Sequence, residues 1–180
     1  KDLETVLEEI KRIVDDLDRR NKEVDKESAK LVKEADEKNK RVDEESAKIV
    51  KRLEREKKDD KDKVTEARRR LERTYREVDK DNKRILDELR RRYEELERRN
   101  EELLREIREK VERAAKKDKD GTDRVRRLRE EVTKLLDEVR RSLDRLRESL
   151  KEWKERVDDS LRRLRDSLRK WKRKLEEATR

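Results

Sequence analysis

An 18-residue repeat governs this chain of 180 residues. Serine, leucine and tryptophan recur at that spacing between SLDRLRESLKEWKERVDD (residues 142–159) and SLRRLRDSLRKWKRKLEE (residues 160–177). The same interval relates residues 21–38 to 39–56, and residues 75–92 to 93–110. Eighteen residues make about five whole turns of an α-helix, so a stripe with this repeat returns to one face without drift. A heptad repeat would require a left-handed supercoil, whereas this repeat predicts nearly straight helices.

Apolar and small polar residues form one stripe within each repeat, at steps of three or four positions. The stripe positions are Asn21, Val24, Ser28, Leu31, Ala35, Asn39, Val42, Ser46, Ile49 and Leu53 in the first segment, Tyr75, Val78, Asn82, Ile85, Leu89, Tyr93, Leu96, Asn100, Leu103 and Ile107 in the second, and Leu143, Leu146, Leu150, Trp153, Val157, Leu161, Leu164, Leu168, Trp171 and Leu175 in the third. This stripe is as narrow as the a/d seam of a coiled coil. Three helices can close over seams this narrow.

The composition is compatible with long helices despite its charge. Charged residues make up 63% of the chain, a proportion typical of disorder. Here acidic and basic residues are finely mixed, and Glu, Lys, Arg and Leu are strong helix formers. No apolar run exceeds two residues, and no signal peptide is visible. We therefore expect a soluble protein without a targeting signal or membrane contact, whose localisation the sequence leaves open.

Two charged segments break the stripe and predict loops. EKKDDKDKV (residues 56–64) leaves Asp62 as a candidate N-cap, and KKDKDGTDR (residues 116–124) contains Gly121 as a helix stop and Thr122 as a cap. The predicted elements are a helix over residues 2–57, a loop over 58–62, a helix over 63–116, a loop over 117–122 and a helix over 123–178. An unbroken helix through residue 60 is the alternative, because the second stripe continues in phase from the first.

These elements predict an all-α fold, a single-chain antiparallel three-helix bundle that forms one domain over residues 1–180. Each helix would be about 80 Å long at 1.5 Å per residue. Short connections between long helices favour antiparallel neighbours. The expected molecule is a coiled-coil-like rod.

The polar residues inside the stripe are the strongest constellation in the sequence. If the chain folds back at about residues 60 and 120, they fall into four layers. The predicted layers are Asn21 with Asn100 and Ser142, Ser28 with Tyr93 and Ser149, Asn39 with Asn82 and Ser160, and Ser46 with Tyr75 and Ser167. A buried polar group without a partner costs about 1–3 kcal/mol, so shared layers would let these groups satisfy one another. Their use would be to specify register and pairing. The alternative is that the serines and tyrosines lie at the seam margin and face water.

Other apolar residues have less specific interpretations. Trp153 and Trp171 are interpreted as core fillers between the polar layers, the alternative being a site for an aromatic ligand or pigment. Further small apolar residues flank the stripe, and we expect them to face each other across the groove between the first two helices. These residues are Val14, Val32, Val50, Ala29 and Ala47 on the first helix, and Leu86 and Leu104 on the second.

Catalytic, cofactor and metal sites are not predicted. General acid–base and metal chemistry uses His, Cys or clustered carboxylates, but the chain has no His or Cys, and no Asp or Glu lies in the stripe of the repeats. The serines have no candidate base beside them. The basic stretch over residues 162–174 could hold a polyanion non-specifically, but a solvated helix face explains it as well, and no specific nucleic-acid partner is expected.

Taken together, the straight repeats, the stripe-centred Asn, Ser and Tyr residues and the charged outer positions resemble de novo designed parametric helical bundles with buried hydrogen-bond networks. The resemblance is one of style and covers the whole chain. It implies a structural scaffold without natural activity that requires no partner. The alternative is a three-helix component of a designed heterodimer or switch, which presents a groove to a partner helix or chain. Natural spectrin-type spacers, with shorter helices and heptads, fit less well.

Overall fold

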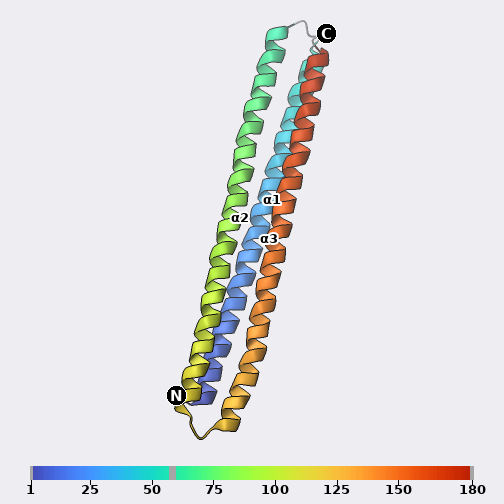
Figure 1. Ribbon diagram of the computed structural model, residues 1–180. Coiled ribbons are helices and arrows are strands. Elements are labelled where there is room, and N and C mark those ends of the chain that lie inside the picture. Colours follow the sequence, from blue (N-terminus) through green and yellow to red (C-terminus); the bar gives the residue numbers. More distant parts are fainter. Residues whose placement is uncertain (1, 57–59, 179–180) are drawn as a thin grey trace. The chain divides into compact units, whose positions relative to one another are not determined.

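A computed structural model of the chain describes residues 2–56 and 60–178, and these residues form three long α-helices. They are α1 (Leu3–Arg55), α2 (Lys61–Lys117) and α3 (Thr122–Ala178), as Figure 1 shows. No strand occurs in the described part of the chain. The predicted all-α fold with three long helices is therefore confirmed.

Contacts divide the helices into two compact units, each built from one segment of every helix. Unit 1 comprises residues 1–27 and 89–151, and unit 2 comprises residues 28–88 and 152–180.

Ion pairs give the direction of the helices within each unit. In unit 1, Lys110 lies 3.5 Å from Glu9, and Arg92 lies 3.7 Å from Glu27, so α1 and α2 run antiparallel. Arg129 pairs with Glu112 at 3.5 Å. These pairings follow from chain reversals near residues 60 and 120.

Unit 2 repeats this arrangement with its own pairs. Lys38 lies 2.8 Å from Asp81 between α1 and α2. Arg165 contacts Asp79 at 2.7 Å between α2 and α3. Long charged side chains therefore bridge neighbouring helices above an apolar core, although such exposed pairs contribute little to stability.

The core of α1 differs from the predicted stripe at two positions. Leu31 and Ile49 were expected in the stripe, but both are only half-buried. The flank residues Val14, Val32 and Val50 are buried instead. Successive helical residues point about 100° apart, so the correction moves the buried face by one position toward the side that the other two helices cover.

The second helix shows the same kind of difference. Leu104, expected on the flank, is buried, whereas Leu103, expected in the stripe, is half-buried. Ile85 and Leu86 both lie at the edge of the core, because both are half-buried. The expected flank therefore does not form a separate surface, since Leu104 belongs to the core.

The N-terminus of α2 is capped by Asp60. Its carboxylate accepts hydrogen bonds from the backbone N–H groups of Asp62 at 3.2 Å and Lys63 at 3.3 Å. The predicted cap, Asp62, instead lies in the first turn of α2. Aspartate suits both places, because a side-chain oxygen satisfies free N–H groups and a negative charge favours a helix N-terminus.

The connection at the end of α1 is described only in part. The helix ends at Arg55, and Glu56 and Asp60 are not helical. An unbroken helix through residue 60 is therefore wrong. Residues 57–59, where the end of the predicted helix meets the predicted loop, lie outside the described residues.

Gly121 immediately precedes α3 and does not end α2. The second helix ends at Lys117, and the carbonyl of Gly121 accepts the N–H of Val125 at 2.7 Å as the first bond of α3. A Cβ atom at Gly121 would lie 2.3 Å from Asp118 Oδ2, so a side chain at this position would require the Asp118 carboxylate to turn away. Thr122 is the first residue of α3 and not its cap.

Candidate functional site: the buried asparagine–serine layers

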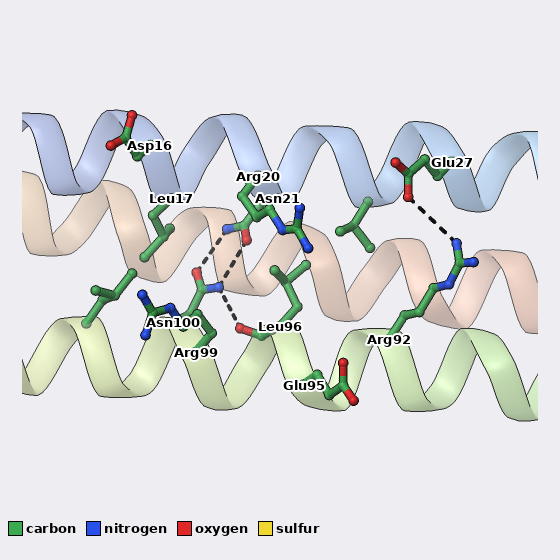
Figure 2. Close-up of a pocket in the computed structure, with 12 residues that line it drawn as sticks. Asp16, Leu17, Arg20, Asn21, Glu27, Arg92, Glu95, Leu96, Arg99 and Asn100 are labelled. Atoms are coloured by element: carbon green, nitrogen blue, oxygen red, sulfur yellow. Dashed lines mark hydrogen bonds and ion pairs between the residues drawn. The ribbon is translucent and has the colours of Figure 1, made fainter.

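Three polar residues meet in the core of unit 1. Asn21 Nδ2 donates to Asn100 Oδ1 at 2.9 Å, and Asn100 Nδ2 donates back to Asn21 Oδ1 at 3.0 Å. Figure 2 shows these two side chains pointing at each other from α1 and α2. Asn21 Nδ2 also donates to Ser142 Oγ on α3 at 2.9 Å. All three helices of the unit therefore contribute to one layer.

Every amide hydrogen of this layer has an acceptor. Asn100 donates its second hydrogen to the Leu96 carbonyl at 2.7 Å, and Ser142 donates to Asp18 Oδ1 at 3.4 Å. Asn21 and Asn100 are almost inaccessible to solvent. Because each of these buried donors is paired, the layer avoids the cost of about 1–3 kcal/mol for an unsatisfied group.

The same layer occurs in unit 2. Asn39 and Asn82 exchange two amide hydrogen bonds of 3.0 Å. Asn39 Nδ2 donates to Ser160 Oγ at 2.8 Å, and Asn82 Nδ2 donates to the Val78 carbonyl at 2.8 Å. Ser160 then donates to Asp36 Oδ1 at 3.0 Å. This second layer has the same donors and acceptors as the first, with each residue displaced by one 18-residue repeat.

The carboxylates of Asp18 and Asp36 are functional parts of the layers that sequence reasoning missed. Each is half-buried and stands three residues before the asparagine of its layer on α1. A signal was present in the sequence, because both are aspartates at an 18-residue spacing on a helix where glutamate, a better helix former, was available.

Asp36 is held in its ionised form. Burial by itself would raise its pKa, but hydrogen bonds from Lys40 and Ser160, together with the positive charge of Lys40, more than offset that effect. The pKa of Asp36 therefore lies below its ordinary value. A carboxylate that stays ionised can only accept hydrogen bonds, which suits it to receive the serine hydroxyl.

The structure does not join the tyrosines to the serines of α3. In unit 1, Tyr93 donates its hydroxyl to Asp25 Oδ1 at 2.8 Å instead. Ser149 is half-buried. Ser28, the third member expected in this layer, is fully buried and belongs to unit 2. A carboxylate on α1 thus takes the role expected of serine, because it is a stronger acceptor for a phenol.

The corresponding tyrosine in unit 2 has a different environment. Tyr75 is buried, and its hydroxyl has no hydrogen-bond partner among the described residues. Ser46 lies nearby but donates its own hydrogen to the Val42 carbonyl at 2.7 Å. Burial raises the pKa of Tyr75 to about 12, against a smaller lowering by Ser46. Ser167 is half-buried and outside this contact.

The two tryptophans are not equivalent. Trp171 is buried in an apolar cluster that includes Leu53 and Leu71, while its indole N–H donates to Asp43 Oδ1 at 3.0 Å. Trp153 is half-buried, with the Arg156 guanidinium 5.1 Å from its ring centre. Trp171 therefore fills core volume and also satisfies its one polar hydrogen.

A shallow groove of about 610 Å³ lies beside the layer of unit 1, between α1 and α2. Leu17, Leu96 and Leu103 line it, and Figure 2 shows charged side chains around it, among them the ion-paired Glu27 and Arg92. Both asparagines reach its wall, but their amide hydrogens are already donated within the protein. The groove therefore offers little unsatisfied hydrogen-bonding capacity.

The described residues contain no group of three or more His, Cys, Asp or Glu side chains placed to hold a metal ion. None of the three helices, over the residues described, has a stretch long and apolar enough to cross a bilayer.

Comparison with solved structures shows a similarity of fold. The chain is similar to a solved structure described as a computationally designed three-helix bundle, with a TM-score of 0.51 and 19% sequence identity over 98% of this chain and 82% of that chain. No protein-family model and no curated protein sequence matches. At this identity the likeness bears on the fold alone, and it agrees with the three helices described above.

Each layer draws its hydrogen bonds from residues of three helices. One turn away along the helices lie buried apolar side chains, among them Ala35, Val42 and Leu96, which cannot accept or donate a hydrogen bond.

Proposed function

We propose that this chain is a designed structural scaffold without catalytic activity, in which the two Asn–Asn–Ser layers specify the register and pairing of the helices. The observation that carries the proposal is the recurrence of one complete hydrogen-bond network, donor for donor, at an 18-residue spacing. The fold shared with a computationally designed bundle is consistent with it.

The layers should act on misaligned states more than on the stability of the native state. Replacing a buried polar set by apolar packing often leaves a protein equally or more stable. Shifting one helix by a single turn, in contrast, would place Asn82 or Asn100 against apolar residues and would cost about 1–3 kcal/mol for each unpaired group. The layers therefore raise the free energy of wrong alignments more than they lower that of the correct one.

A double-mutant cycle tests the proposal. The variants are Asn21→Leu, Asn100→Leu and the double variant, with free energies of unfolding measured in denaturant. Either single change leaves the other asparagine buried without its reciprocal partner, so each should cost about 1–3 kcal/mol. The double change should cost less than the two single changes combined, and the protein should be about as stable as the parent.

The control combines changes in two asparagines that belong to different layers. Asn21→Leu and Asn82→Leu remove one member of each layer and share no hydrogen bond. Their effects should add, because separated sites are usually independent. If the Asn21 and Asn100 changes are equally additive, these residues do not act as one layer and the proposal fails.

The second candidate function is a component of a designed heterodimer or switch, and the groove beside Asn21 and Asn100 favours it. No large hydrophobic residue is exposed in the described part of the chain, and interfaces for partner helices are usually apolar. We therefore expect a monomer in dilute solution that folds without a partner. Light scattering together with circular dichroism tests this, because an obligate dimer or a chain that folds only with an added helix would favour the second candidate.

A further inference from the structure

Hydroxyl groups on these helices usually bond to their own helix. Ser46 donates to the Val42 carbonyl, and threonines do the same one turn back, at 2.7–2.9 Å. The threonines are Thr65, Thr74 and Thr133. This intrahelical bond is the ordinary choice for a serine or threonine within a helix.

Ser142 and Ser160 depart from this behaviour. Each donates its hydrogen to another helix, Ser142 to Asp18 at 3.4 Å and Ser160 to Asp36 at 3.0 Å. Each also accepts a hydrogen bond from an asparagine of that same helix. Both hydrogen bonds of each serine therefore connect α3 to α1.

The two contacts come from one face of α1. Asp36 and Asn39 are three residues apart, so their side chains are neighbours on the helix surface. The Ser160 oxygen accepts from Asn39 at 2.8 Å and donates to Asp36 at 3.0 Å. Because one atom makes both bonds, a displacement of α3 by a single residue, about 1.5 Å along its axis, would strain both together.

Lysines complete the arrangement at the surface. Lys40 lies 3.1 Å from Asp36 Oδ2, and Lys22 lies 2.9 Å from Asp18 Oδ2. In each case the lysine contacts Oδ2 and the serine donates to Oδ1, which in Asp18 also lies 3.9 Å from Arg145. Exposed ion pairs of this kind add little stability, but they orient the carboxylate toward the core.

We propose that Asp18 and Asp36 are the positioning residues that set the register of α3 on α1, by drawing the serine hydrogen outward so that the serine oxygen accepts from asparagine. The reciprocal Asn–Asn pair sets α2 on α1, and the Asp–Ser–Asn contact sets α3. This inference rests on the proposed function, since it assigns one of the two pairings within each layer to the aspartate.

The test uses the full chain with Asp36→Ala and Asp36→Asn. Both variants lose the ion pair with Lys40, but only asparagine keeps an oxygen that can accept from Ser160. The readout is solvent exchange of the side-chain amide hydrogens of Asn39, followed by NMR. Asp36→Ala should speed exchange of the hydrogen donated to Ser160 by about two- to tenfold, the range expected for one hydrogen bond of ordinary net strength. Asp36→Asn should restore slow exchange.

The control variants change the equivalent aspartate of the other layer and an aspartate on the surface. Asp18→Ala should speed exchange at Asn21 and leave Asn39 unchanged, and Asp36→Ala should do the opposite, because the layers belong to different units. Asp16→Ala removes an exposed carboxylate that pairs only weakly, with Arg19 at 3.6 Å, and should change neither. Should Asp36→Ala fail to fold, Asp18→Ala provides the same test in unit 1.

The outcomes separate this inference from the proposed function. Fast exchange of the Asn39 and Asn82 amides in the parent protein would mean that the layer does not form, and the proposed function would fail. Slow exchange in the parent that persists in Asp36→Ala would overturn the role of the aspartate alone. Equal acceleration in Asp36→Ala and Asp36→Asn would also overturn it, because the ion pair and not the acceptor oxygen would then be responsible.

Discussion

Trp171 donates its indole N–H to the Asp43 carboxylate at 3.0 Å. One repeat earlier on α1, the equivalent carboxylate of Asp25 accepts the hydroxyl of Tyr93 at 2.8 Å. The two positions are identical in sequence pattern, and each carboxylate accepts a hydrogen bond from a buried aromatic side chain. Tyr75, one repeat before Tyr93, is buried, and its hydroxyl has no hydrogen-bond partner among the described residues.

We expect Tyr75→Phe and Tyr93→Phe to differ in sign. Removing the Tyr75 hydroxyl removes an unsatisfied buried group, so the free energy of unfolding should be unchanged or rise, by up to about 1–3 kcal/mol. Removing the Tyr93 hydroxyl breaks a bond to a carboxylate and should cost about 1–3 kcal/mol. Urea unfolding of both variants checks this, and an equal loss in both would mean that Tyr75 has a partner in solution.

Asp60 should matter more than Asp62 for the start of α2. The Asp60 carboxylate accepts two backbone N–H groups, and loss of an N-cap typically costs about 1 kcal/mol. Asp62→Ala removes only a favourable charge in the first turn, worth about 0.3–1 kcal/mol. The two variants have the same change in charge, so their denaturation midpoints compare the cap directly. A larger loss for Asp62→Ala would contradict the assignment.

Stability should decrease on acidification. The pKa of Asp79 is lowered by its hydrogen bond with Lys83, against a smaller raising by burial, and that of Glu72 by its hydrogen bond with Lys172. A group whose folded pKa lies below its unfolded value contributes stability above the unfolded pKa and loses it as the pH falls through the folded value. The contribution should therefore be complete near neutral pH and fall below about pH 5. Asp79→Asn should flatten the dependence, as measured by urea unfolding from neutral to acidic pH.

Leu71 should be among the most costly core truncations. Its side chain is 1% exposed and belongs to the cluster of Trp171 and Leu175. Leu71→Ala should destabilise unit 2 by about 2–5 kcal/mol, the usual range for a leucine cavity. Leu168→Ala, at a half-buried position beside the same cluster, is the matched control and should cost less. Similar losses would show that burial is equal at the two sites.

Thermal unfolding should be difficult to reach near neutral pH. Idealised long helices with local contacts are commonly very stable. We expect a midpoint above about 60 °C, near the upper end of the mesophile range, by circular dichroism. A midpoint below that value would count against a designed origin.

The fold and the asparagine pairs follow from periodicity alone. Five turns per repeat place Asn21 and Asn39 on one face, and chain reversals near residues 60 and 120 bring Asn100 and Asn82 beside them. Neither inference needs side-chain detail, because helix geometry converts sequence position into height along the bundle. The structure has these pairs at 2.9–3.0 Å.

The remaining details of the core and of the layers depend on side-chain directions, which periodicity does not resolve. Val32 is buried and Leu31 is not, because neighbouring residues differ by about 100° and the position of the third helix decides between them. Asp18 and Asp36 received no role from the sequence, because they lie outside the stripe and their 18-residue spacing alone does not show that a carboxylate turns inward. The surroundings of the two tyrosine hydroxyls likewise depend on side-chain directions, because Tyr93 donates to Asp25 while the Tyr75 hydroxyl has no partner among the described residues.

The recurrence of one layer at an 18-residue spacing also makes the length of the protein adjustable. A further block of this size in each helix would extend the helix by about 27 Å and return every side chain to its original direction. The inserted blocks would bring their own asparagine, serine and aspartate residues, so they could form a further hydrogen-bonded layer. The number of repeats therefore sets the length of each helix, while the layer within each repeat sets how the helices pair, and the two can be changed independently.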